Sequence, residues 1–450
     1  MTIINFCILL LSINISEITI DNFSQQEKMA DSLYSIADSL YKAGYYSESN
    51  AKYQQSGEIY EFLALFAEKM DYSNDIIDKL WEKHLLYFAD MAYNLGAMAN
   101  FKDALESVDN GMKKMKRIFE SNKLLEGKFN GTMGSIYYFN GNFEKSLEHQ
   151  TKCLETRVIY FGSRHIQVAS AHNNLGNVYK DKGNYEKGYA HITKALSIWK
   201  EAFGPNHTYI GICYTNIGVI MMETGDYRKA LEYYEQALAI YKTNLGPRHS
   251  HVAATYNNIG NILKDTYQFT EALTYYLDAL NIWSDLLGRD HPSMANPFNN
   301  IGLTYFNLNQ LDSALHYYDI ALNLRIRGYG EDNPIICTTL LNIGYTYDKQ
   351  GYHSKSSELY HRAIQIWART FGAVHPNLGK GYNYLGKSYY LMKKYDQSLS
   401  YYQKASMSLI EGFNYSNIYI NPPIFNAVSK LILLDTLEAK GNVLYKKAMQ

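Results

Sequence analysis

One position of the sequence recurs at a fixed interval, and this recurrence limits the choice of fold more than any other feature. It lies in the segments NNLGNVY, TNIGVIM, NNIGNIL, NNIGLTY, LNIGYTY and NYLGKSY. The central glycines are Gly176, Gly218, Gly260, Gly302, Gly344 and Gly386, and every step is 42 residues. Gly134 and Ala92 extend the series, and a degenerate copy 55 residues earlier places Ala37 there. A period of this length indicates a repeat array. We call this position 0 of each repeat.

Each period reads as two helices. In one copy, apolar and small residues recur at helical spacing from 169 to 182, a break follows at Lys182-Gly183-Asn184, and the pattern resumes at Tyr185. A second glycine series with the same step, Gly162 to Gly372, ends the second helix, and Pro292, Pro334 and Pro376 mark entry to the next first helix. Small residues at position 0, with tyrosines 16 residues later, predict close helix packing. The expected fold is all-α.

The repeats predict the domain organisation. Residues 27–126 hold degenerate repeats, residues 127–412 hold regular ones, and 413–425 form an irregular link, because Pro422 and Pro423 forbid a helix there. Residues 426–450 should form the unpaired first helix of a further repeat, with Gly441 at position 0. Its expected apolar stripe is Val428, Leu431, Leu434, Leu437 and Leu444. Solenoids end in polar caps, so this end predicts a fragment of a longer chain, self-association or docking of a partner.

The first 20 residues form a candidate signal peptide or disordered leader. Their apolar run, from Ile3 to Leu11, is too short to span a bilayer. It resembles a secretory h-region, but no Lys or Arg precedes it. The protein is exported if this leader is a signal and cytoplasmic otherwise. No later stretch has the length and apolarity of a membrane span.

GYNYLGKS, residues 381–388, matches the phosphate-loop pattern G-x-x-x-x-G-K-[ST], which would place Lys387 on phosphates and Ser388 on Mg²⁺. Such a loop follows a buried strand and opens a helix whose N–H groups hold the anion. Here Gly386 is position 0 of a repeat and lies inside a predicted helix. We therefore predict that the stretch does not bind a nucleotide.

Composition and spacing disfavour other kinds of site. Lys plus Arg number 43 against 44 Asp plus Glu, which lacks the basic excess of nucleic-acid-binding proteins. The four cysteines have no C-x-x-C spacing and read as buried small hydrophobes. A recurrent histidine occurs one repeat apart at His165, His207, His249, His291 and His375. Packed helices are about 8–10 Å apart and metal ligands lie about 2 Å from the ion, so these are turn-closing residues. We expect no catalysis, metal or cofactor.

The pattern L-G, Tyr, G-x-Y, Ala, Tyr, Ala resembles the tetratricopeptide repeat, strongly over residues 127–412. The resemblance implies a right-handed superhelix of antiparallel helix pairs that binds a protein or peptide in its concave groove. N-N-[LI]-G and G-x-x-H-P resemble the 42-residue form of kinesin light chains, which implies a cargo adaptor as one alternative, although the heptad segment that joins a motor is missing. ADSLYSIADSLYKAGYYSES and the C-terminal segment resemble the repeat region of Bacteroidetes CHAT-domain proteins. That resemblance implies a regulatory module of a caspase-like peptidase, whose catalytic domain these residues lack.

Amide and lysine side chains on the first helices are the candidate groove residues. They occupy positions −3, +1 and +4, which should face the concave surface: Asn173, Asn177, Lys180, Asn257, Asn261, Lys264, Asn299, Asn383 and Lys387. Asn offers both a donor and an acceptor to a bound peptide backbone. The alternative is that these amides only cap and cross-link neighbouring helices. The asparagines at position −2, such as Asn300 and Asn342, are expected to hold helices together.

Overall fold

The computed structural model describes residues 20–42, 45–119, 122–423 and 427–449. Residues 1–19, which contain nearly all of the candidate signal peptide, lie outside this part of the chain. Its helices are α-helical pairs, with two short 3₁₀ turns, and the prediction of an all-α repeat fold is confirmed. The chain divides into a first unit that ends at Gly204 and a second that begins at Pro205. Each is described by itself.

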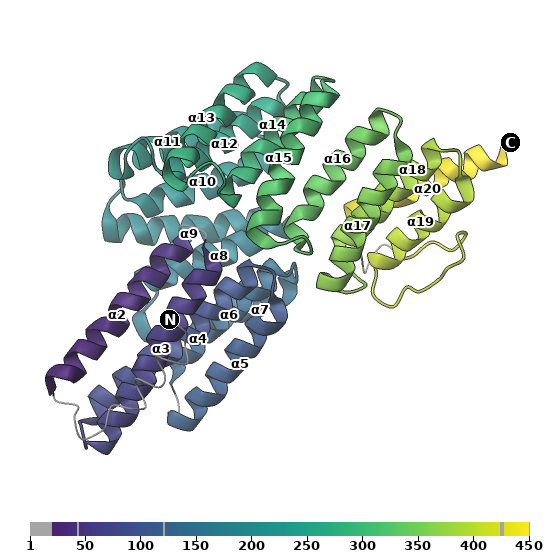
Figure 1. Ribbon diagram of the computed structural model, residues 1–450. Helices are drawn as coiled ribbons and strands as arrows, with labels where there is room; N and C mark the ends of the chain where they lie inside the picture. The colour runs from purple at the N-terminus through teal and green to yellow at the C-terminus, as the bar shows by residue number, and fades with distance from the viewer. Residues whose placement is uncertain (1–19, 43–44, 120–121, 424–426, 450) are drawn as a thin grey trace. The chain divides into compact units, whose positions relative to one another are not determined.

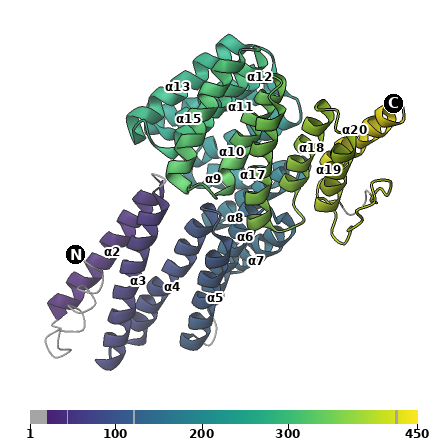
Figure 2. The ribbon, with the colours of Figure 1, turned by 45° about the vertical axis from the view of Figure 1, so that its right-hand side comes forward.

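The first unit contains four antiparallel helix pairs (Figures 1 and 2). They are α2 (Ile20–Lys42) with α3 (Tyr46–Lys69), α4 (Asn74–Ala97) with α5 (Phe101–Ile118), α6 (Lys123–Phe139) with α7 (Phe143–Phe161), and α8 (Ile166–Asp181) with α9 (Tyr185–Phe203). Ala37 and Ala92, the residues at position 0 of the two degenerate repeats, are fully buried. The longer stride between them follows from the 24 residues that α3 and α4 each contain.

The second unit contains five pairs and one further helix. The pairs are α10 (Thr208–Glu223) with α11 (Tyr227–Leu245), α12 (Ser250–Asp265) with α13 (Phe269–Leu287), α14 (Ala295–Asn307) with α15 (Leu311–Tyr329), α16 (Cys337–Lys349) with α17 (His353–Phe371), and α18 (Pro376–Leu391) with α19 (Tyr395–Ser408); α20 spans Lys430–Ala448. The 3₁₀ turns η2 (Pro292–Met294) and η3 (Pro334–Ile336) precede α14 and α16, as the proline positions predict.

The core of a regular repeat is a glycine pressed against a tyrosine. Gly260 of α12 faces Tyr276 of α13, and a Cβ atom added to the glycine would lie 2.6 Å from the tyrosine Cε1. The Tyr276 ring is fully buried. The same pairing recurs for Gly218, Gly302, Gly344 and Gly386 with the tyrosine at position +16. Any side chain at position 0 would therefore enter the space of this ring.

The turns between repeats combine a glycine with a capping side chain. Gly204 follows α9 at φ +83°, a region that favours glycine. His207 then begins the next repeat: its Nδ1 accepts a hydrogen bond from the backbone N–H of Tyr209 at 3.2 Å. His165, His249 and His375 cap their helices in the same way, as does Asn333 at the equivalent position. These histidines close turns, as predicted. No group of three or more His, Cys, Asp or Glu in the described residues is placed to hold a metal ion.

The turn within each repeat also needs a left-handed residue. Gly141, Gly183, Gly225 and Gly351 occupy it with φ between +72° and +86°. Four sister repeats place another residue there: Ala99, Tyr267, Asn309 and Lys393, with φ between +59° and +63°. The backbone geometry of the turn is thus kept where the glycine is lost, at the cost of local strain.

Helix α20 packs against α19 and α18, where the first helix of a further repeat would lie (Figures 1 and 2). The predicted packing face was wrong. Gly441 has no atom within 4 Å of an added Cβ, and Leu431 and Leu434 are 72% and 50% exposed. The buried residues are Leu433, Thr436, Lys440 and Val443. Self-association through this helix stays a prediction.

The Lys440 side chain explains this rotation of α20. Its ammonium donates to Gln403 Oε1 at 2.7 Å and to Asn421 Oδ1 at 2.9 Å, so it joins α20 to α19 and to the irregular link. Burial lowers the pKa of Lys440. A lysine at a buried position is not recognisable from an apolar periodicity. In the described residues, no helix is long and apolar enough to cross a membrane.

Candidate functional site

The asparagines at position −3 have their side-chain oxygens occupied inside the second unit. Asn300 donates to Asn257 Oδ1 at 2.9 Å, and Asn342 donates to Asn299 Oδ1 at 3.0 Å. Each bond joins position −2 of one repeat to position −3 of the repeat before it. Asn383 accepts in the same way from Thr436 of α20 at 2.9 Å. These amides therefore form links between successive first helices, and a ligand contact by the same residues stays a prediction.

Position +1 behaves differently in two repeats that both carry asparagine there. In the second unit, Tyr276 donates its hydroxyl proton to Asn261 Oδ1 at 2.8 Å. In the first unit, the residue equivalent to Tyr276 is Ile192, which has no donor to offer. Asn177 Oδ1 is accordingly buried without a hydrogen-bond partner. An unsatisfied buried polar atom costs about 1–3 kcal/mol, so this amide needs a partner from outside the fold.

The converse mismatch occurs one repeat later, in the second unit. There Tyr234 fills position +16, but position +1 is Val219. The Tyr234 hydroxyl is buried without a hydrogen-bond partner. The Tyr–Asn bond is therefore a property of repeats that have both residues.

The lysines at position +4 lie beside carboxylates. Lys180 is 3.4 Å from Asp181, and Lys264 is 3.0 Å from Asp265; both lysine side chains are 13% exposed. Asn173 lies one turn before Asn177 on α8. On α8 and α12 the chain thus presents the same asparagine–lysine–aspartate set, with the asparagine oxygen free only on α8.

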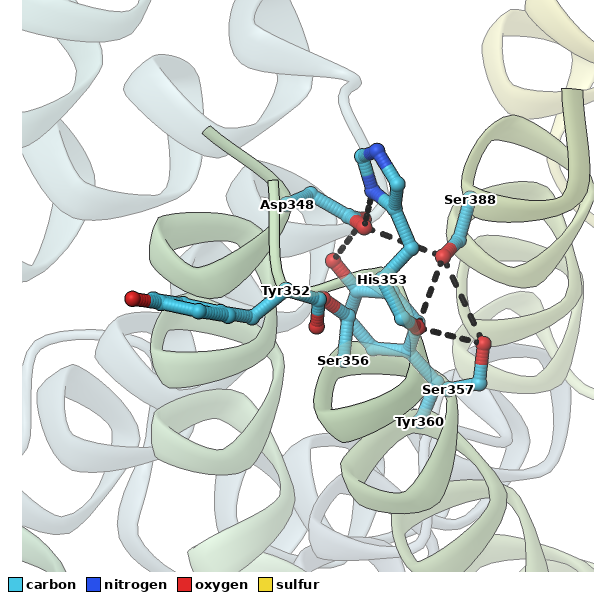
Figure 3. A network of polar contacts seen from close by, with 7 residues as sticks. All are labelled: Asp348, Tyr352, His353, Ser356, Ser357, Tyr360 and Ser388. Carbon is cyan, nitrogen blue, oxygen red and sulfur yellow. Dashed lines mark hydrogen bonds and ion pairs between the residues drawn. The ribbon is translucent and has the colours of Figure 1, made fainter. Parts of the chain in front are cut away.

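The stretch GYNYLGKS lies within α18, and its two diagnostic side chains have structural partners. Lys387 is exposed; its ammonium lies 4.8 Å from the centre of the Tyr345 ring and donates to that hydroxyl at 3.3 Å. Ser388 is fully buried and donates to Asp348 Oδ1 at 2.9 Å (Figure 3). A serine in this position is not accessible to a magnesium ion on a bound nucleotide.

The network around Ser388 contains serine, histidine and aspartate, but not in a catalytic order (Figure 3). His353 Nδ1 and Ser388 Oγ both contact Asp348 Oδ1, and Tyr360 donates to the other oxygen at 3.0 Å. None of the hydrogen bonds of these described residues joins the Ser388 hydroxyl to the His353 ring, as a general base would require. The network connects α16, α17 and α18.

Sequence reasoning missed a ring pair that recurs between the two helices of a repeat, at positions −4 and +15. It is Tyr214 with Tyr233, Tyr256 with Tyr275, and Tyr382 with Tyr401, with ring centres 5.6–6.4 Å apart. In the repeat of Gly176, the pair is His172 and His191, whose Nδ1 atoms are 2.9 Å apart. Both rings must be neutral, because one donates and the other accepts.

We expect this histidine pair to make stability depend on pH. Burial, then His191 and Lys194, lowers the pKa of His172 to about 4; burial, then Lys194 and Lys187, lowers the pKa of His191. An unfolded histidine titrates near 6.5. The unfolded chain therefore binds more protons between pH 6.5 and 4, and stability is lost as the pH falls through that window. Thermal melting from pH 7.5 to 4.5 checks this.

The matched control is His172→Tyr with His191→Tyr, which installs the ring pair of the next repeat. The variant should lose less of its melting temperature between pH 7.5 and 4.5 than the parent chain. Burial also lowers the pKa of His84, His149, His251 and His361, so the dependence should weaken without vanishing. Identical pH profiles for the two proteins would contradict the prediction.

The comparison with known families decides the identity of these repeats. The tetratricopeptide repeat profile matches residues 126–187, 167–243, 251–327, 293–360 and 336–406, which together exceed half of the chain. The chain belongs to the tetratricopeptide repeat family. The matched ranges fall within the span over which the sequence pattern predicted this family. No curated protein matches the chain.

Solved tetratricopeptide-like structures share the fold at low sequence identity. A putative kinesin light chain from Podosopora anserina is 17% identical, with a TM-score of 0.37 over 46% of this chain and 98% of that one. The apo quorum sensor NprR from B. thuringiensis is 17% identical, with a TM-score of 0.53 over 82% and 97%. A Rap protein complexed with Competence and Sporulation Factor is 15% identical, with a TM-score of 0.52 over 83% and 99%.

Proposed function

We propose that this tetratricopeptide protein binds a protein or peptide segment along the surface formed by its first helices. Asn177 carries the proposal: it is a first-helix amide whose oxygen is buried and unpaired, while the same position in the repeat of Gly260 is satisfied internally. A peptide backbone N–H or a side-chain donor would supply the missing bond. The Rap structure, which contains a bound factor, supports the idea that this fold can hold a partner.

The two asparagines at position +1 have different roles under this proposal. Asn177 on α8 contacts the ligand, and so does the neighbouring Lys180. Asn261 on α12 first of all accepts the hydroxyl bond of Tyr276. Replacing Asn177 should therefore weaken binding, whereas replacing Asn261 should leave the Tyr276 hydroxyl without a partner and weaken the fold instead.

The experiment is selection of binders from a random peptide library displayed on phage, with the full chain as bait. Individual peptides are then titrated against the parent chain, Asn177→Leu and the matched Asn261→Leu. We expect affinity to fall at least tenfold in Asn177→Leu with an unchanged melting temperature. Asn261→Leu should lower the melting temperature and keep the affinity of the folded fraction. Peptides that bind all three proteins equally, or no selectable peptide, would overturn the proposal.

The relation to CHAT-domain proteins is a finer proposal. It rests on the resemblance of the residues near 33 and of the C-terminal segment, which lie outside the matched repeats. Under it, ligand binding by the repeats would regulate a caspase-like peptidase encoded with or beside this chain. The sequence of the adjoining gene tests it: a His/Cys peptidase domain there supports regulation, and unrelated genes contradict it.

A further inference from the structure

A hollow of about 110 Å³ lies among α4, α6, α7 and α8 in the first unit. Its aromatic walls are Tyr93, Tyr138 and Phe139, and its polar residues include Gln150 and Asn177. An engineered cavity of about 150 Å³ in a protein core binds benzene. A hollow of this volume, open to solvent on one side, therefore has room for one planar ring.

The repeat explains why space is left at this place. Gln150 occupies position +16 of the repeat of Gly134, where five later repeats have tyrosine. In the second unit, the tyrosine at this position, Tyr360, stacks at 5.4 Å on Tyr384, which is position −2 of the following repeat. Around the hollow, the equivalent residues are Gln150 and Asn174. The hollow thus lies where a sister repeat places a tyrosine ring.

Two acceptors in the hollow have no donor. Gln150 is 2% exposed, and its Nε2 donates to the Gly131 carbonyl at 3.0 Å and lies 3.3 Å from Ser135 Oγ. A carbonyl can only accept, so this bond fixes the amide orientation and leaves Gln150 Oε1 as the buried, unpaired atom. Asn177 Oδ1 is the second unpaired acceptor. In the repeat of Gly260, the equivalent acceptor is satisfied by a tyrosine hydroxyl.

We propose that the hollow of Gln150 and Asn177 is a subsite for an aromatic side chain that carries a neutral hydroxyl donor, such as a tyrosine of the bound peptide. The walls offer ring faces and edges to a planar group. The lining contains no charged side chain, and burying an unpaired charge is far costlier than burying a hydroxyl that finds its acceptor. This inference deepens the proposed peptide binding and rests on it for its biological role.

The test uses p-cresol, the side chain of tyrosine, and toluene, which has the same ring without the donor. Both are titrated into the full chain and followed by ligand-observed NMR. We expect p-cresol to bind at least fivefold more tightly than toluene. Gln150→Tyr, which installs the residue of the sister repeats, should abolish binding of both. Asn177→Leu should bring p-cresol to the affinity of toluene, and Asn261→Leu, in the second unit, should change neither.

The outcomes separate this inference from the proposed function. Equal binding of p-cresol and toluene, absence of p-cresol binding up to its solubility, or unchanged binding in both Gln150→Tyr and Asn177→Leu would each overturn the subsite. Circular dichroism establishes that each variant is folded, and Asn177→Leu decides the matter if Gln150→Tyr is not. Library peptides that need Asn177 but contain no tyrosine would overturn the subsite and leave peptide binding standing. Selective p-cresol binding without any peptide binder would do the reverse.

Discussion

Gly344→Val should destabilise the protein by about 1–3 kcal/mol, because it forces a branched side chain into a filled helix contact. A Cβ at Gly344 lies 2.5 Å from Tyr360 Cε1, and the Tyr360 ring is fully buried and bonded to Asp348. The ring therefore has little freedom to move away. The corresponding distance at Gly386 is 2.9 Å from Tyr402, so Gly386→Val should cost less. Urea unfolding of the two variants measures the difference.

Gly441→Val is the matched control for this substitution. It also lies within a helix, but no atom comes within 4 Å of an added Cβ. It should leave the free energy of unfolding nearly unchanged, since valine also has a slightly better helix propensity than glycine. Equal losses for Gly344→Val and Gly441→Val would show that position 0 is not a packing position.

Asp348→Ala should destabilise the second unit by about 3 kcal/mol, since hydrogen bonds to a charged group contribute about 1.5–3 kcal/mol each. Its carboxylate side chain is 3% exposed and accepts from three side chains on two other helices: His353, Tyr360 and Ser388. Removing the acceptor leaves buried donors without partners. Chemical unfolding of the full chain, read by circular dichroism, measures the loss.

Asp278→Ala provides the control, because this aspartate is exposed on α13 and its removal should change stability by less than about 0.5 kcal/mol. A double-mutant cycle of Asp348→Ala with Ser388→Ala should show a loss smaller than the sum of the two single losses, because the residues share one network. Additive losses, or an Asp348→Ala loss no larger than that of the control, would contradict the structural role of the network.

The fold was predictable because its constraint is periodic. A glycine that recurs every 42 residues indicates a packing position, and the structure places tyrosine rings against most of these glycines. The C-terminal helix defeated the same reasoning, since Gly441 occurs only once in its context and the packing face includes the hydrogen-bonded Lys440. The left-handed turn of Tyr267 was likewise hidden, because backbone strain leaves no signal in a tyrosine.

The candidate site was predictable only in part. The recurrence of asparagine identified positions −3 and +1, but it could not separate amides bonded to a neighbouring repeat from an amide left unpaired. A signal for Asn177 was nonetheless present in the sequence: Gln150 and Ile192 interrupt the run of tyrosines at position +16. In a repeat protein, such departures from the repeat's own pattern indicate where packing has been replaced by an opening for a ligand.

Photo-crosslinking tests most directly whether the first helices form the binding surface. Benzoylphenylalanine replaces Asn174 of α8 in one protein and the exposed Ser197 of the second helix α9 in another, and each is irradiated with a peptide selected from the library. Our account predicts a crosslinked product from position 174 that excess unlabelled peptide suppresses, and none from position 197. Crosslinking from position 197 alone would show that the partner binds the second helices, and would contradict the account.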